Sequence, residues 1–406
     1  MIQVIEPSVK PRIKQKSLAA PALRKSAFET KHVGRPNLGN RDRFIARVNE
    51  ILDRRWLSNN GPVVQEFEKR IAEILGVKHA IAMCNATAAI EIACRALGLK
   101  GEVILPSYTF VATAHALQWQ EITPVFCDMD PVTHNIDPAK IERLITPKTT
   151  GIIGVHVWGR GCDTEAIAEI AARRNLKVMY DASHGFGCSK SGQMIGTFGE
   201  CEVFSFHATK FINCLEGGVV ATNNDKLAYQ MRMMTNFGFT GFDKVEYLGI
   251  NGKMHEISAA MGLTNLEAMD EIIAVNRQNY EAYKAGLAEV PGIAVIDYDP
   301  TERNNYQYVV LEVDPEVCLR RRDEIVEALH AENIIARKYF WPGCHKMEPY
   351  RSLQPNADLL LPETERIAAR VIVLPTGQTV EKETVSRICE IIREAVMAKR
   401  LIANNH

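Results

Sequence analysis

One lysine in this chain stands where a charged side chain is unexpected. In the stretch EVFSFHATKFINCLEGGVVATNN, residues 202–224, Lys210 lies between two apolar runs that have the pattern of core strands. Lysine is rarely buried, and a buried lysine shifts its pKa readily, which suits it to act as a base or to bond a carbonyl carbon. Taken alone, Lys210 is more simply interpreted as a surface charge. The neighbouring elements are needed to decide whether its side chain is exposed or held inside for chemistry.

The elements around Lys210 alternate between short apolar strands and helices. The expected strands cover residues 79–84, 101–106, 123–130, 150–159 and 176–183, and the expected helices cover 87–97, 109–119, 137–145 and 163–175. This alternation is typical of an α/β fold with a mostly parallel sheet covered by helices on both faces. Strands at 201–206 and 217–223 follow each other too closely for a helical crossover, so we expect them to be antiparallel. A long helix at 259–287 then leads into a smaller α+β unit.

Polar residues stand at or just beyond the ends of these expected strands. They are Asn85, Ser107, Asp181, Ser205 and His207. Each has a simple structural interpretation, for example Asp181 as a helix cap. In doubly wound sheets, however, ligands bind outside the carboxyl ends of the strands. We therefore expect these side chains to converge on one rim together with Lys210.

Composition and motifs exclude several classes of protein. The net charge of −1 gives no basic field for nucleic acid. The 10 cysteines contain no CxxC pair, which is typical of reduced thiols in a cytoplasmic protein. No apolar run approaches the roughly 20 residues that cross a bilayer, and no complete nucleotide or metal motif occurs. We therefore expect a cytoplasmic protein with no nucleic-acid partner, no membrane span and no metal.

A lysine, an aspartate and an anion site at a helix N-terminus are what pyridoxal 5′-phosphate requires. The lysine amine forms a Schiff base with the aldehyde, and an ionised aspartate keeps the ring nitrogen protonated. The sequence NATAA, residues 85–89, opens a helix whose free N–H groups favour a phosphate dianion. Phe110 either stacks on the cofactor ring or packs in the core. The pattern favours Lys210 and Asp181 as catalytic residues of a pyridoxal phosphate enzyme.

A set of ordered sequence blocks points to a family. The blocks are WLSNNGP, CNAT, PSYTF, DASH, FSFHATK, EGG, NGKMHEISAAMGL and LPTG. From about Arg35 to the C-terminus they resemble the DegT/DnrJ/EryC1/StrS family of sugar-nucleotide aminotransferases. The resemblance implies a fold-type I pyridoxal phosphate transferase, similar to aspartate aminotransferase, with a mostly parallel seven-stranded mixed sheet and a smaller α+β C-terminal domain. We expect an N-terminal extension at 1–40, a cofactor-binding large domain at 41–285 and a small domain at 286–406.

The same resemblance implies a role for each residue of the site. Lys210 is implied as the Schiff-base lysine, and Asp181 as the partner of the pyridinium nitrogen. His184 is implied beside the ring hydroxyl, and Asn251 is implied to reach the cofactor phosphate from a neighbouring subunit. The other cofactor-binding residues implied are Ala86, Thr87 and Ser205 for the phosphate and Phe110 for the ring.

The blocks GRPN, NFGF, NNYQYV and YFWPGCHKMEPYR narrow the resemblance to the branch that aminates C4 of a dTDP-4-keto-6-deoxyhexose. Many relatives have Gln in place of His184 and Gly in place of Ala86, but both departures also occur in this branch. The presence of Lys210 argues against a branch that carries His there and dehydrates its substrate.

The resemblance also implies the partners of the enzyme. These are a nucleotide-sugar substrate, L-glutamate as amino donor, and a second subunit in a homodimer with shared active sites. The amino sugar would serve lipopolysaccharide O-antigen or a glycosylated natural product. Alternatives left open are amination at C3 or of another nucleotide-linked keto-sugar, and a regulatory protein of the same fold without turnover.

Overall fold

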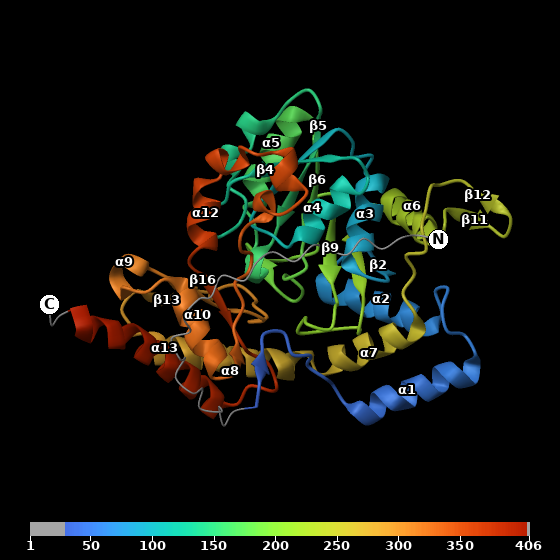
Figure 1. Ribbon diagram of the computed structural model, residues 1–406. Coiled ribbons are helices and arrows are strands. Elements are labelled where there is room, and N and C mark those ends of the chain that lie inside the picture. The colour runs from blue at the N-terminus through green and yellow to red at the C-terminus, as the bar shows by residue number, and fades with distance from the viewer. Residues whose placement is uncertain (1–28, 404–406) are drawn as a thin grey trace, which may run out of the picture.

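The computed structural model describes residues 29–403, and its centre is one seven-stranded sheet (Figure 1). The strand order is β2-β10-β9-β6-β5-β3-β4. The strands are β2 (His79–Met83), β3 (Glu102–Pro106), β4 (Thr123–Cys127), β5 (Thr149–Val155), β6 (Lys177–Asp181), β9 (Cys201–Ser205) and β10 (Gly218–Thr222). β10 alone runs in the direction opposite to the other six strands of this sheet. The predicted mostly parallel mixed sheet, with an antiparallel pair at 201–206 and 217–223, is confirmed.

Helices cover both faces of the sheet because its strands carry apolar side chains on both sides. On one face, α3 (Ala86–Ala96), α4 (Val111–Gln118) and α6 (Asp225–Thr235) share a buried apolar core with the strands. On the other face lie α2 (Pro62–Leu75), α7 (Glu256–Glu267) and α5 (Thr164–Arg174). α1 (Arg41–Arg54) packs on the outside of α7 (Figure 1).

Two helix predictions are wrong in detail. Residues 137–145 form two 3₁₀ turns, η1 (Pro138–Lys140) and η2 (Glu142–Leu144), instead of one α-helix. The Asp137 side chain accepts a hydrogen bond from the N–H of Ala139 at 3.0 Å, so the chain enters η1 through a tight turn. The expected helix at 259–287 is divided into α7 and α8 (Met269–Leu287) at Ala268, whose φ of −100° and ψ of 9° are not helical.

The C-terminal part has its own core. Strands β13 (Ile293–Val295), β14 (Val309–Val313) and β16 (Val371–Leu374) form an antiparallel sheet, packed against α8, α10 (Arg322–Ala331) and α13 (Lys382–Ala403). α8 begins in the core beneath the large sheet and ends in this second core. The domain limits at 41–285 and 286–406 therefore stay a prediction, with residue 285 inside α8.

The N-terminal segment is tied to the C-terminal part. β1 (Lys31–His32) pairs in parallel with β15 (Ile334–Ile335), while residues 1–28 of the expected extension lie outside the described residues. In residues 29–403, no helix combines the length and apolarity needed to cross a membrane. The remaining short elements are β7 (Ser189–Lys190), β8 (Gln193–Met194), β11 (Phe239–Gly241), β12 (Lys244–Val245), η3 (Val157–Gly159), α9 (Pro315–Cys318), η4 (Cys344–Lys346), α11 (Tyr350–Leu353), η5 (Ala357–Leu360) and α12 (Pro362–Ala368).

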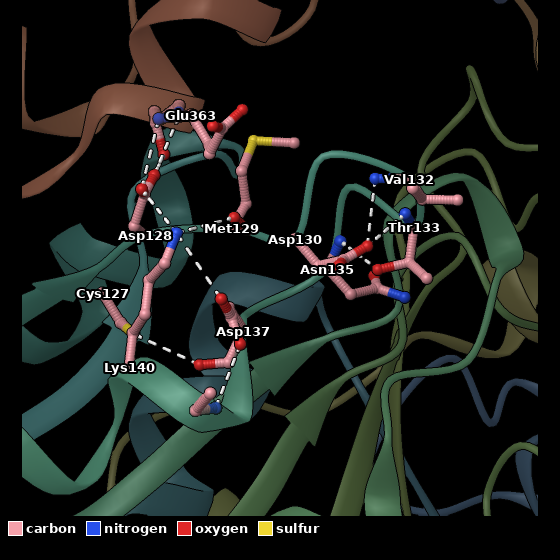
Figure 2. Close-up of polar contacts among 12 residues, drawn as sticks. Cys127, Asp128, Met129, Asp130, Val132, Thr133, Asn135, Asp137, Lys140 and Glu363 are labelled. Atoms are coloured by element: carbon pink, nitrogen blue, oxygen red, sulfur yellow. Dashed lines mark hydrogen bonds and ion pairs between the residues drawn. The ribbon is translucent and has the colours of Figure 1, made fainter.

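A buried aspartate joins the large sheet to α12, as Figure 2 shows. Asp128, directly after β4, accepts hydrogen bonds from the backbone N–H groups of Thr364 at 2.8 Å and Glu363 at 3.2 Å. The amine of Lys140 donates to the same carboxylate at 2.9 Å. The first N–H groups of a helix have no partner within the helix, and the helix dipole favours an anion there. Asp128 therefore fixes the start of α12 at the edge of the large sheet.

Candidate active site

A cavity of about 680 Å³ lies at the carboxyl ends of β6 and β9 and the N-termini of α3 and α4. Every residue that the family resemblance assigns to the site, except Asn251, lines it: Ala86, Thr87, Phe110, Asp181, His184, Ser205 and Lys210. His207 also lines the cavity, but Ser107 does not. Instead Ser107 is fully buried, with its hydroxyl 2.7 Å from Nδ1 of His345. The expected convergence of strand ends is therefore correct except for Ser107.

Lys210 lies in the loop between the antiparallel strands β9 and β10, which holds it over their ends. Its backbone N–H donates to the carbonyl of His207 at 2.9 Å, and its amine lies 3.5 Å from the hydroxyl of Tyr308. The side chain is half-buried and faces the cavity. Burial lowers the pKa of Lys210 to about 8, although the negative charge of Asp181 acts in the opposite direction. The amine is thus partly neutral near pH 7.

Asp181 ends β6 and is 5% exposed. Its Oδ1 accepts a hydrogen bond from the N–H of Ser183 at 3.0 Å, and its Oδ2 accepts one from the hydroxyl of Thr113 at 2.7 Å. Sequence reasoning missed Thr113, although it lies just one helical turn after Phe110 in the helix expected at 109–119. The carboxylate is held by two donors at the wall of the cavity.

His184 is a neutral hydrogen-bond donor at the cavity wall. Its Nδ1 accepts the N–H of Trp158 at 3.2 Å. Burial and the nearby charge of Lys210 lower the pKa of His184 well below its usual value. In the neutral ring, the acceptor role of Nδ1 leaves the proton on Nε2. The ring lies between aromatic neighbours, with Tyr308 at 4.5 Å and Phe340 at 5.8 Å between ring centroids.

Tyr308 and Phe340 were also missed by sequence reasoning. Both line the cavity although they belong to the C-terminal part of the chain. Tyr308 lies in the block NNYQYV, which suggested only a subgroup of the family. Burial raises the pKa of Tyr308, so its hydroxyl keeps its proton near neutral pH. The walls of the site therefore come from both parts of the chain.

The anion end of the cavity is formed by the start of α3 and the end of β9. Asn85 caps α3, its side chain accepting the N–H of Ala88 at 2.8 Å, while the earlier N–H groups of a helix have no intrahelical partner. β10 passes close to this helix start. Gly218, which pairs with Ser205 in the sheet, lies so near that an added Cβ would be 2.4 Å from the carbonyl oxygen of Asn85. Gly218 thus permits the close approach of β10 to α3.

Phe110 stands immediately before α4 and is 59% exposed although it lines the cavity. Packing in the apolar core, the alternative interpretation of its sequence position, is therefore wrong. The ring instead offers a flat apolar surface at the site, which suits stacking on a planar ligand.

Asn251 does not line the cavity of its own chain. It is exposed, in a loop where it forms an antiparallel bridge with Asn236. The amine of Lys253 donates to the side chain of Asn236 at 2.9 Å. The carbonyl of Gly252 accepts the N–H of Cys84 at 2.7 Å, which joins the loop to the end of β2. The predicted role of Asn251 at a partner's site stays a prediction.

The groups in the cavity fit pyridoxal phosphate. They provide an amine of lowered pKa, a carboxylate with two donors, a neutral imidazole, a half-exposed aromatic ring and a helix N-terminus beside a hydroxyl. Within residues 29–403, no cluster of His, Cys, Asp or Glu side chains could hold a metal ion. Fold and site together are those of a fold-type I, pyridoxal-phosphate-dependent enzyme.

Comparison with known proteins identifies the family. The sequence model of the DegT/DnrJ/EryC1/StrS aminotransferase family matches residues 39–393, and the chain belongs to this family. It is 38% identical over 362 residues to a dTDP-4-amino-4,6-dideoxy-D-glucose transaminase of Shigella dysenteriae, covering 89% of this chain and 98% of the relative. It is 35% identical to a GDP-perosamine synthase of Caulobacter vibrioides, covering 90% and 98%. The crystal structure of DesI in the presence of its TDP-sugar product superposes with a TM-score of 0.89 at 46% identity, covering 94% and 97%.

Proposed function

We propose that this aminotransferase moves the amino group of glutamate to C4 of a dTDP-linked 4-keto-6-deoxyhexose. The product would be a 4-amino-4,6-dideoxyhexose nucleotide. The observation that carries the proposal is the similarity to DesI, at 46% identity over nearly the whole chain, because that structure was obtained with a TDP-sugar product. The Shigella dysenteriae relative, named as a dTDP-4-amino-4,6-dideoxy-D-glucose transaminase, supports the same substrate class.

Different residues of the cavity would bind different parts of pyridoxal phosphate. The N–H groups of Ala86 and Thr87 and the hydroxyl of Ser205 would hold its phosphate, and Phe110 would pack on its ring. His184 would donate from Nε2 to the ring hydroxyl. When bound, the cofactor accepts an amino group from the donor, passes it to the ketone, and spreads negative charge from the reacting carbon into its ring.

Two side chains would hold or move protons during the transfer of the amino group. Asp181, held in place by hydrogen bonds from Thr113 and Ser183, would keep a proton on the ring nitrogen. Lys210 would hold the cofactor aldehyde and, once released, would act as the base that moves a proton between cofactor and substrate carbons. Its pKa of about 8 suits that task, because a base works best when its pKa lies near the working pH. Its contact with Tyr308 would limit the positions that the free amine adopts.

The charges of the cavity support a site completed by a second subunit. Among the described residues that line it, Lys210 is the only Lys or Arg, whereas Glu91, Asp181 and Glu216 are acidic. A cofactor phosphate and a sugar diphosphate both require donors or positive charge. We propose a homodimer with two-fold symmetry, in which Asn251 of the partner subunit reaches the phosphate and each subunit completes the other's site.

The shared site can be tested by complementation between two defective subunits. Lys210→Ala is combined in one dimer with Asn251→Ala, or with a stronger loop lesion, using two affinity tags to purify mixed dimers. Because one of the two sites then carries neither lesion, mixed dimers should recover up to about half of the wild-type activity. Inactive mixed dimers would place both residues in the same site and would contradict the proposal.

A second candidate substrate is a GDP-linked 4-keto-6-deoxyhexose, favoured by the 35% identity to GDP-perosamine synthase. The deciding experiment compares kcat/KM for dTDP-, GDP- and UDP-linked 4-keto sugars and for a 3-keto sugar, each with glutamate. The proposal predicts that the dTDP-linked 4-keto sugar is preferred. A preference for the GDP sugar or for the 3-keto sugar would contradict the proposal and would identify that sugar as the substrate instead.

We also propose a cytoplasmic enzyme whose product enters a surface polysaccharide such as lipopolysaccharide O-antigen. This is supported by the 32% identity to SpsC of Bacillus subtilis, named as a spore coat polysaccharide biosynthesis protein. Deleting the gene in the source organism should then remove an amino sugar from its surface polysaccharide, measured by sugar analysis of the purified polymer. An unchanged composition would contradict this role.

A further inference from the structure

A short chain of hydroxyl groups leads from α4 to the carboxylate of Asp181. Thr113, in the first turn of α4, is fully buried, and its Oγ1 lies 2.7 Å from Oδ2 of Asp181. Behind it, Oγ1 of Thr109 lies 3.1 Å from Oγ1 of Thr113, and Thr109 is 1% exposed. The two threonines are four residues apart in sequence, but Asp181 is far along the chain. The contact between Thr113 and Asp181 therefore exists only in the folded protein.

The direction of the hydrogen bonds follows from the acceptors. Oγ1 of Thr113 also lies 3.1 Å from the carbonyl oxygen of Phe110, but a hydroxyl has a single proton to donate. The carboxylate of Asp181 is both closer and charged, and hydrogen bonds to charged acceptors are about twice as strong as neutral ones. Thr113 therefore donates to Asp181, and its lone pairs are free to accept the proton of Thr109.

The Asp181 carboxylate depends on such donors because it is almost completely buried. A buried charge without hydrogen bonds is strongly disfavoured. The N–H of Ser183 serves Oδ1, and Thr113 serves Oδ2. Loss of the Thr113 hydroxyl would leave Oδ2 without this donor and would free the carboxylate to rotate about its last bond.

We propose that Thr113, supported by Thr109, is a positioning residue that keeps the carboxylate of Asp181 directed at the ring nitrogen of pyridoxal phosphate. The inference rests on the proposed function, in which Asp181 faces that nitrogen. The first turn of α4 then serves the site twice. Phe110, directly before the helix, presents its ring to the cavity, and Thr113, one turn later, fixes Asp181.

The test compares Thr113→Val, which keeps the shape but removes the hydroxyl, with Thr113→Ser, which keeps the hydroxyl. Thr113→Val should lose about 10- to 100-fold in kcat/KM, as expected for a missing hydrogen bond to a buried charge. Thr113→Ser should stay within a few-fold of wild type, and Thr109→Val should show a smaller loss than Thr113→Val. Thr222→Val is the matched control, because Thr222 is also buried and its hydroxyl donates to the carbonyl of Glu200 at 2.7 Å.

Two readouts separate positioning from a general structural role. The first is a pH titration of the absorbance of the bound cofactor, which Thr113→Val should shift and Thr222→Val should not. The second is a double-mutant cycle with Asp181→Asn. If Thr113 acts through Asp181, Thr113→Val should cost little in the Asp181→Asn background, so the two effects are not additive.

The inference is overturned if Thr113→Val keeps the wild-type rate and titration, or if its effect adds fully to that of Asp181→Asn. A Thr113→Val protein that does not fold is replaced by Thr113→Cys, whose weak S–H donor carries the same prediction. A wild-type protein that binds no pyridoxal phosphate overturns the proposed function itself. Normal wild-type binding with an unaffected Thr113→Val variant overturns only the role of Thr113.

Discussion

The lowered pKa of Lys210 leads to a quantitative prediction for the cofactor-free enzyme. Burial moves this pKa from an ordinary 10.5 to about 8. At pH 7 the neutral fraction of the amine then rises from about 0.03% to about 10%, roughly 300-fold. The Lys210 amine should therefore react with an amine-specific reagent at pH 7, where an amine of pKa 10.5 is almost entirely protonated and unreactive.

The assay is competitive labelling between about pH 6 and pH 11, with mass spectrometry of the peptide that contains Lys210. Its labelling should have a midpoint near pH 8. In urea the midpoint should return to about 10.4, the value for an unperturbed lysine. Asp181→Asn tests the direction in which the Asp181 charge moves the pKa of Lys210. The Asp181 charge raises the pKa of Lys210, so its removal should move the midpoint to lower pH. A midpoint at or above about pH 10 in the folded protein would refute the reasoning.

Other predictions follow from single contacts. Asp181→Asn should reduce kcat by several orders of magnitude, because a neutral partner no longer holds the ring proton; wild-type kinetics would make Asp181 only a cap. Gly218→Ala should weaken pyridoxal phosphate binding in a fluorescence titration, because its Cβ would lie 2.4 Å from the Asn85 carbonyl; Gly241→Ala, whose Cβ meets nothing closer than 3.8 Å, is the control. Asp128→Ala should lower the free energy of unfolding by about 2–3 kcal/mol in urea titrations. Burial alone would raise the pKa of Asp128, but hydrogen bonds from Lys140 and Thr364 lower it overall. Its contribution is therefore complete above the unfolded value of 3.8 and is lost as pH falls through the folded value. If the free energy of unfolding differed equally between wild type and Asp128→Ala at pH 7 and well below pH 3, this expectation would be contradicted.

Much of the site could be predicted because it depends on local patterns. Continuous apolar strands separated by helices predict a parallel sheet, and the carboxyl ends of such strands meet at one edge. Asp181, Ser205 and Lys210 were found in this way, since each lies at or just beyond a strand end. Phe110 was left undecided, because its neighbours in sequence do not show whether its ring faces the core or a cavity.

The remaining features depend on contacts between distant segments. Thr113 is an ordinary residue of a helix and Tyr308 lies directly before β14, and only the fold brings them to Asp181 and Lys210. Ser107 shows the reverse case, because it directly follows β3 as expected of a site residue but is hydrogen-bonded to His345 from the C-terminal part.

The wrong helix at 137–145 has a local cause. Its apolar residues Ile141, Leu144 and Ile145 suit a 3₁₀ repeat of three residues as well as an α-helical repeat. The sequence pattern could not distinguish these, and the chain forms two 3₁₀ turns at this place.

The most direct test of the account follows nitrogen from donor to sugar. Purified enzyme with pyridoxal phosphate is supplied with ¹⁵N-labelled glutamate and dTDP-4-keto-6-deoxyglucose, and the product is examined by NMR. The account predicts label on C4 of the hexose, formation of 2-oxoglutarate in equal amount, and no product with Lys210→Ala. Label on C3, label transfer by Lys210→Ala at the wild-type rate, or an unchanged keto-sugar would contradict it.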